Sequence, residues 1–456
     1  MKRRTTVWSY ITRIFKSQGI RRMLLVTIGL LIIYRLAAHV PVPGVDREAL
    51  ATLLQAGGAG GTLLGLLDML SGGTVSNFSV LAMGVYPYIT AQIILQLLVP
   101  IIPSWKARMD DDPREGRQWM EKWTYYLAIP MAFLQAIGQI NIFSSFAGTP
   151  IIANFGFSGE SLLPTMAILF TMTAGTMFAI WLGELISEFG LRRQGLSLII
   201  FAGIVSQIPQ NFGTLMQDQQ NRWFLLVFSI ILVALTVFAI VIVQQGRRNV
   251  PVMYPGRRIG NRMSMPVKGT LPLMVNMAGM IPIIFAQSIL AFPAVLASFF
   301  LTSESEWVVG AANWTQLNFG GGTGTYWILF FLMVVAFTFF YTDVLFAQQN
   351  YGENLKRSGA QIPGVSRGEK TQVYLTKVLR RITFPGALFL GFIAILPYLA
   401  SLLVPALRLG GGSNSAGVLL VSSAGLLIVV GVVRDVFFSI DAELKLHGYD
   451  ETLIVR

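Results

Sequence analysis

The stretch WFLLVFSIILVALTVFAIVIVQ, residues 223–244, decides the fold class of this chain. It contains no charged residue, and it is long enough to cross the hydrocarbon core of a bilayer, which takes about 20 residues of helix. Its apolar residues are continuous and do not alternate with polar ones, so the pattern predicts a helix and not a strand of a membrane barrel. We therefore expect residues 223–244 to form a transmembrane helix.

The rest of the chain shares this character. Of its 456 residues, 54% are hydrophobic and only 12% are charged, whereas soluble domains carry about 25% charged residues. Ten apolar runs have spanning length, which predicts an all-α membrane protein with ten transmembrane helices. The runs are Arg22–Val40, Phe78–Ile102, Trp123–Phe143, Leu162–Ile186, Leu196–Gly213, Trp223–Gln244, Leu271–Leu301, Thr325–Phe346, Ile382–Leu403 and Val418–Phe438.

The basic residues predict the orientation, because basic loops stay on the cytoplasmic side. With the N-terminus inside, the inner segments hold 29 of the 34 Lys and Arg residues, so both termini are predicted to be cytoplasmic. Two inner loops, residues 244–270 and 347–381, are basic and longer than the topology needs. We expect them to be docking surfaces for a partner that is acidic or contains RNA, although topology alone is an alternative explanation of their charge.

The N-terminal segment has two interpretations. Residues 1–34 followed by RLAAH (35–39) resemble a signal peptide with a cleavage site. Arg35 interrupts that site, and cleavage would leave nine spans with the basic loops on the wrong side, so a retained first helix is favoured. Before it, apolar residues from Val7 to Phe15 recur at helical spacing, which predicts a helix lying on the membrane surface. We assign residues 1–22 to this cytoplasmic segment.

The composition does not indicate catalytic or metal chemistry. Two His and no Cys leave little material for a metal site or a thiol nucleophile. The glycine clusters at 57–61 and 320–324 lack the Lys-Ser/Thr of a phosphate-binding loop and fall in outer loops. The acidic residues 110–112 lie beside basic residues, as on an ordinary solvated surface. We therefore expect a protein that is not an enzyme, with no metal and no cofactor.

A short apolar run, TLLGLLDML at 62–70, is flanked by glycines. It is too short to cross a bilayer, and Asp68 makes it too polar to settle in hydrocarbon. The glycines on both sides give the backbone freedom to move. The residues alone allow two interpretations, a flexible outer loop with an incidental helix or a movable element.

Long strings distributed over the chain resemble a single family. They are YRLAAHVPVPGVD (34–46), MLSGGTVSNFSVLAMGVYPYITAQIILQLL (69–98), GTMFAIWLGELISEFG (175–190), LSLIIFAGIV (196–205), LPLMVNMAGMIPIIFAQSI (271–289), FFYTDVLF (339–346), NLKRSGAQIPGV (354–365) and LLIVVGVVRD (426–435). In this order they resemble the SecY family of protein-conducting channels. Two loops depart from the family pattern. GLRRQG (190–195) is one residue longer than the corresponding family loop, and in VSRGE (365–369) the basic residue is Arg367, one position after Ser366, where the family has it.

The resemblance implies two pseudo-symmetric halves of five helices, residues 23–215 and 216–438, and a cytoplasmic tail at 439–456. It implies that unfolded preproteins cross the plasma membrane along the channel axis, and that a side seam releases transmembrane segments into lipid. The short run at about 61–76 then becomes a re-entrant plug helix in the outer funnel. The plug residues are Thr62, Leu63, Leu64, Gly65, Leu66, Leu67, Asp68, Met69 and Leu70.

The resemblance also implies site residues, which would otherwise be taken for core residues. A hydrophobic pore ring keeps ions out because its walls offer nothing to replace their hydration. The ring residues are Val85, Ile89, Leu196, Ile200, Ile284 and Ile428. The lateral gate lies between the second and seventh spans, at Gln96 and Asn276, whose amides are expected to bond across the seam with about 0.6–2 kcal/mol, or else to form a permanent interhelical bond. The partner-docking residues are Arg247, Arg248, Arg257, Arg258, Lys356, Arg357 and Arg367.

The family also implies partners, because the chain has no nucleotide-binding fold of its own. They are the motor ATPase SecA, translating ribosomes, the membrane subunits SecE and SecG, unfolded preproteins with their signal sequences, and membrane lipid, all at the bacterial plasma membrane. The alternative is a secondary transporter of a small solute. A transporter would need ionisable groups at mid-membrane, whereas the charges within the apolar runs lie near helix ends.

Overall fold

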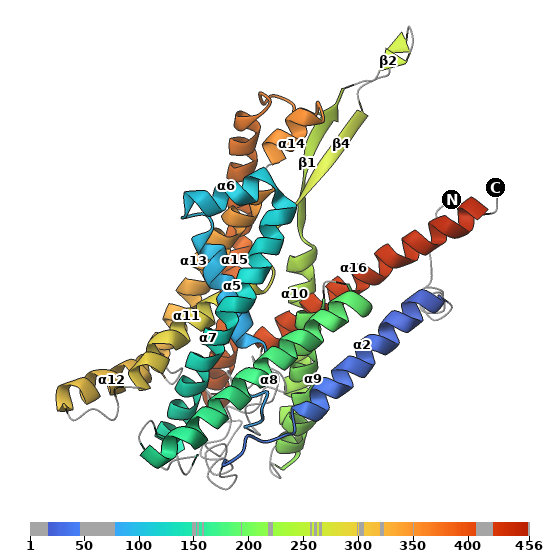
Figure 1. The fold of residues 1–456 in the computed structure, drawn as a ribbon. Coiled ribbons are helices and arrows are strands. Elements are labelled where there is room, and N and C mark those ends of the chain that lie inside the picture. Colours follow the sequence, from blue (N-terminus) through green and yellow to red (C-terminus); the bar gives the residue numbers. More distant parts are fainter. Residues whose placement is uncertain are drawn as a thin grey trace.

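Long helices form a bundle, and a two-stranded hairpin extends from one end of it (Figure 1). This computed structural model describes residues 17–45, 78–147, 152, 155–156, 159–192, 194–217, 222–255, 258–259, 262–263, 267–298, 300, 305–319, 323–349, 351–406 and 423–454. The helical fold class that the apolar runs predict is confirmed.

A helix overlaps each of the ten predicted runs. In chain order these are α2 (Gln18–Ala37), α5 (Tyr86–Leu98), α7 (Pro113–Ala147), α8 (Leu162–Phe189), α9 (Gly195–Gln217), α10 (Arg222–Gln245), α11 (Ile281–Ser298), α13 (Gly324–Gln348), α15 (Glu369–Ala406) and α16 (Ser423–Ile454). Shorter helices are α6 (Pro103–Asp111), η1 (Gly159–Ser161), α12 (Glu306–Phe319) and α14 (Tyr351–Arg357).

The number of membrane spans stays a prediction. By length and composition, four stretches of the described residues can cross a membrane, namely Leu162–Phe189, Leu226–Gln245, Gly324–Arg357 and Glu369–Leu396. The pair α5 and α6, bent by 100° at the break between them, would make a fifth. Several helices also run past the predicted limits, so the proposed boundaries at 22/23 and 438/439 fall inside α2 and α16.

The loop after α10 contains strands that the sequence analysis did not predict. β1 (Arg247–Tyr254) pairs antiparallel with β4 (Val267–Met274), and the short β2 (Arg258–Ile259) pairs with β3 (Arg262–Met263). The predicted seventh run was therefore wrong at its start, since Leu271–Met274 belong to β4 and α11 begins at Ile281. The physical reason is a period of two: Val250, Val252 and Leu273 are buried while their neighbours along each strand are exposed.

Hydrogen bonds connect α2, α8 and α9 around the turn between α8 and α9. The Ser187 hydroxyl donates to the Gly183 carbonyl oxygen at 3.0 Å and accepts from the Gly195 N–H at 3.1 Å. On the other side of this turn, the Thr27 hydroxyl of α2 accepts a buried bond of 3.2 Å from the Leu191 N–H. Small side chains thus let three helices meet at one turn.

Candidate functional site

The six residues of the predicted pore ring come from four parts of the bundle. They are Val85 and Ile89 at the start of α5, Leu196 and Ile200 at the start of α9, Ile284 in α11 and Ile428 in α16. Four of them are buried, while Ile89 and Leu196 are half-buried. Because all six are aliphatic, their side chains present no group that could replace the water around an ion.

Five of these six side chains pack in one apolar cluster, which joins α5, α9 and α16. The sixth, Ile284, belongs to a neighbouring cluster that also contains Phe285 and Tyr341. Ile89 packs against both clusters and links them.

Of the two predicted gate residues, one lies on α5 and the other shortly before α11, and these two helices contact each other. Gln96 is half-buried on α5, whereas Asn276 is buried in the turn between β4 and α11. The Asn276 amide nitrogen donates to the Gly279 carbonyl oxygen at 3.1 Å, and its Oδ1 accepts from the Gly279 N–H at 2.9 Å. Within the described residues, no hydrogen bond joins Gln96 to Asn276. The Asn276 amide instead shapes a turn in which Gly279 has a φ of 65°.

The nine predicted plug residues, 62–70, lie outside the residues that the structure describes. The last described residue before them is Val45, and the first after them is Phe78. The plug assignment is therefore still a prediction.

The two basic inner loops, predicted to be docking surfaces, are joined to each other. Met253 of β1 and Gln361, in the loop after α14, exchange two backbone hydrogen bonds of 2.8 Å. Beneath them, Val250 and Val252 share a buried apolar cluster with side chains of α13, α14 and α15. The hairpin and the loop after α14 thus form one surface, which we call the hairpin platform (residues 247–255, 267–274 and 351–369).

Five of the seven predicted docking residues have exposed side chains on the hairpin platform. They are Arg247, Arg248, Lys356, Arg357 and Arg367. One of them, Arg357, forms a 2.8 Å ion pair with Glu353 of the same helix. Of the other two, Arg257 lies outside the described residues, and Arg258 begins β2 with its side chain outside them.

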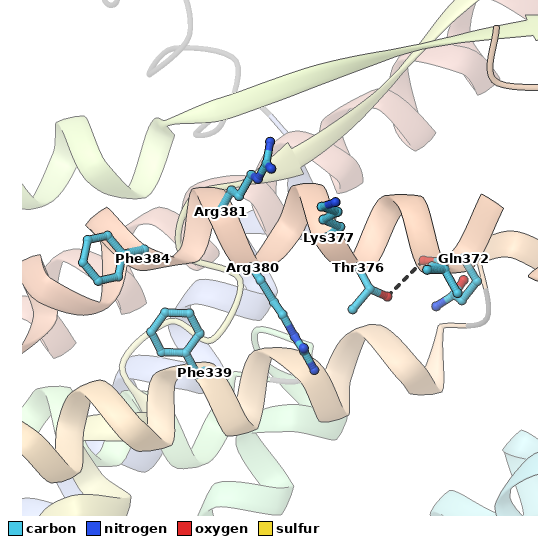
Figure 2. A pocket seen from close by; sticks show the side chains of 8 residues that line it. Phe339, Gln372, Thr376, Lys377, Arg380, Arg381 and Phe384 are labelled. Carbon is cyan, nitrogen blue, oxygen red and sulfur yellow. Dashed lines mark hydrogen bonds between the residues drawn. The ribbon is translucent and has the colours of Figure 1, made fainter. Parts of the chain in front are cut away.

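A groove of about 660 Å³ between α13 and α15 was not predicted. Figure 2 shows Arg380 of α15 reaching toward α13 beside Phe339, while Arg381 points away. The Arg380 guanidinium bonds the Asp343 carboxylate at 2.8, 3.1 and 3.3 Å. The sequence carries one signal for this pair, an acidic residue near the end of an otherwise apolar run. The pair joins the C-terminal part of α13 to the N-terminal part of α15.

The described residues hold no group of three or more His, Asp or Glu side chains that could bind a metal ion. At the gate and ring, the Asn276 amide bonds the Gly279 backbone, the Ser288 hydroxyl donates to the Ile284 carbonyl oxygen, and Ser288 also shares a side-chain hydrogen bond with Tyr86 of α5.

Comparison with known proteins decides the family. The family model SecY matches residues 79–437. This chain belongs to the SecY family. Its SecY relatives include the "Protein translocase subunit SecY" of Streptomyces griseus, 36% identical over 97% of this chain and 99% of the relative. The protein of the same name from Halalkalibacterium halodurans is 37% identical over 96% of this chain and 98% of its own, and that from Escherichia coli K12 is 36% identical over 95% and 94%.

Solved SecY-type structures share the fold. One, described as a protein-conducting channel, aligns with a TM-score of 0.56 at 17% identity over 94% of this chain and 93% of that chain. Another, a SecY protein whose plug domain is described as stabilising the closed channel and maintaining a membrane seal, aligns with a TM-score of 0.59 over the same shares at 17% identity. These comparisons give no support to a secondary transporter. As a SecY-family protein, the chain is a multi-pass membrane protein.

Proposed function

We propose that this chain is the channel-forming subunit of a Sec protein translocase, which passes unfolded preproteins across the bacterial plasma membrane and releases transmembrane segments into lipid. The observation that carries the proposal is similarity to translocase subunits over at least 95% of the chain. The fold shared with a solved protein-conducting channel supports it. In this proposal the chain is a conduit and not an enzyme, so a partner supplies the energy.

The six-residue ring is proposed to be the constriction of this channel. The clustering of five of its side chains, and the packing of Ile89 against the cluster that contains Ile284, support this assignment. Ile89, Ile200 and Ile284 come from three different helices, and we call them the isoleucine triad. Aliphatic side chains can exclude ions from a closed pore and yet yield to a passing chain, because they make no directional bonds.

The plug and the gate complete the proposal. We assign the plug role to residues 62–70 on the family resemblance; the plug domain of a solved SecY protein is described as maintaining a membrane seal. The seam between α5, with Gln96, and α11, next to Asn276, is the lateral gate. The Asn276–Gly279 turn then acts as a local brace before the start of α11, and a side-chain hydrogen bond between Tyr86 of α5 and Ser288 of α11 crosses the seam itself.

The proposed partners follow from the orientation. With both termini and the hairpin platform in the cytoplasm, the exposed Arg247, Arg248 and Arg367 face an approaching SecA motor or ribosome. Ribosomal RNA and acidic protein surfaces both attract such a basic surface. SecE and SecG are the proposed membrane subunits, and they would clamp the two halves, residues 23–215 and 216–438.

Crosslinking to a stalled secretory chain tests the proposal, because this chain has no Cys of its own. We expect a cysteine at Val85→Cys or Ile428→Cys to crosslink to a preprotein halted by a folded C-terminal domain. The control is Leu235→Cys, whose parent side chain on α10 is 64% exposed, and which should not crosslink to a hydrophilic stretch of the preprotein. Equal crosslinking at all three sites, or none at Val85 and Ile428 with the preprotein demonstrably halted, would overturn the proposal.

A further inference from the structure

Helix α12 (Glu306–Phe319), with the sequence EWVVGAANWTQLNF, was not anticipated. It lies between α11 and α13 in the chain and contacts both. Ala312 is buried on the packed face, and Phe319 packs against the main core cluster. One side of α12 is therefore fixed to the bundle.

The opposite side of α12 carries an exposed apolar stripe. Trp307, Ala311 and Trp314 recur at spacings of four and three, so they lie on one face of the helix, and Leu317 continues it. Their exposure is high, at 81% for Trp307, 63% for Trp314 and 57% for Leu317. Among the described residues, nothing packs over these three large side chains.

The length of α12 excludes a membrane span. Its 14 residues make a helix of about 21 Å at 1.5 Å per residue, whereas the hydrocarbon core is about 30 Å thick. Its single charge is Glu306, in the first turn. A short helix with one charge and two exposed tryptophans matches the boundary between headgroups and acyl chains, where Trp places its ring in the apolar layer and its N–H near water.

The position of α12 in the molecule agrees with this depth. Figure 1 shows it projecting sideways from the bundle, at the end far from the β1–β4 hairpin. Both neighbours also expose large apolar side chains, Phe292 and Leu296 on α11 and Ile328 near the start of α13. The two helices that α12 contacts thus also carry exposed apolar side chains, which suit a lipid environment.

We propose that α12 lies in the interfacial region of the outer leaflet, with the stripe of Trp307, Trp314 and Leu317 in contact with lipid, and that it anchors the outer end of α11 there. The assignment to the outer leaflet rests on the orientation in the proposed function. Lipid is favoured over a second copy of the chain because three large side chains form a small patch, whereas a specific protein interface buries about 1,200 Å² or more in total.

Depth-dependent quenching tests this proposal on the purified full chain in phosphatidylcholine–phosphatidylglycerol vesicles. Single cysteines at Trp307→Cys, Trp314→Cys and Leu317→Cys are labelled with a polarity-sensitive fluorophore. Lipids with a spin label near the headgroup or deep in the acyl chain then serve as quenchers. If a tryptophan variant does not elute from the purification column like the parent chain, Ala311→Cys, on the same stripe, is measured instead. Leu332→Cys, exposed in α13, is the deep control, and Asn249→Cys, exposed on β1, is the aqueous control.

We expect the shallow quencher to quench the three stripe labels at least twofold more strongly than the deep quencher does. At the Leu332 site the order should be reversed, and at the Asn249 site neither lipid should quench the label. Water-like emission without quenching at the stripe would overturn the proposal. Shielding from both quenchers, together with disulfide-linked dimers at Trp314→Cys, would show a second copy instead and would also overturn it. No preprotein is present, so the outcome is independent of whether the chain transports protein.

Discussion

Gly195→Ala should destabilise the first half of the protein through the contact between α8 and α9. A Cβ atom at position 195 would lie far inside 3.0 Å of the Gly183 carbonyl oxygen and 2.7 Å from Ser187 Oγ. The backbones must separate to relieve this overlap, because the Gly183 oxygen is not a movable side chain. Overpacking of this kind costs about 1–3 kcal/mol, and loss of the Ser187–Gly195 hydrogen bond adds about 1 kcal/mol. The expected loss of unfolding free energy is thus about 2–4 kcal/mol.

Gly183→Ala is the matched control, at the other side of the same contact. Its Cβ would meet only side-chain ends, Leu196 Cδ2 at 2.8 Å and Ile199 Cδ1 at 3.3 Å. These groups can rotate away, and Ala gains about 1 kcal/mol over Gly within a helix, so the net change should stay within about 1 kcal/mol. Both variants are measured by sodium dodecyl sulfate titration of the purified chain in detergent micelles. Equal stability of the two variants would refute the reasoning.

Three more predictions concern the ring, the α2 contact and the platform. Replacing the isoleucine triad by Ala should let vesicles containing the chain leak small ions, while the same change in three exposed isoleucines should not; equal leakage would contradict the ring. Thr27→Val should cost about 1–3 kcal/mol, because it leaves the buried Leu191 N–H unpaired, and Thr27→Ser should recover most of this in the same titration. Arg367→Glu should weaken binding of SecA or ribosomes in sedimentation assays, most at low salt, and a similar loss with Arg117→Glu, exposed near the start of α7, would argue against specific docking. The three exposed isoleucines that serve as the control for the isoleucine triad are Ile129, Ile231 and Ile328.

The helices could be predicted from the sequence because the residues of a spanning helix form one continuous apolar run. The ring could be predicted only through resemblance to the family, since an aliphatic residue in the pore has the same type as one in the core. The structure adds that Ile89 packs against both apolar clusters, a contact that depends on how helices distant in sequence meet.

The sequence analysis predicted neither the hairpin nor α12, for different reasons. Leu271–Met274 lie directly before a longer apolar run. The sequence alone therefore predicts that they begin the helix of that run and not a strand. The second case, α12, is too short for a search based on spanning length. The sequence predicts that the Asn276 amide bonds Gln96 across the seam, whereas the amide bonds the backbone of Gly279, three residues away. The residue type does not distinguish between these two partners.

The backbone bonds between Met253 and Gln361 have a mechanical consequence. β1 starts directly after α10 and β4 leads into α11, while the loop that carries Gln361 leads into α15. A load applied to the hairpin tip is therefore divided among three membrane helices at once. One of those helices, α11, carries Ile284, so a displacement of the hairpin can be passed on to the helix that holds this predicted ring residue.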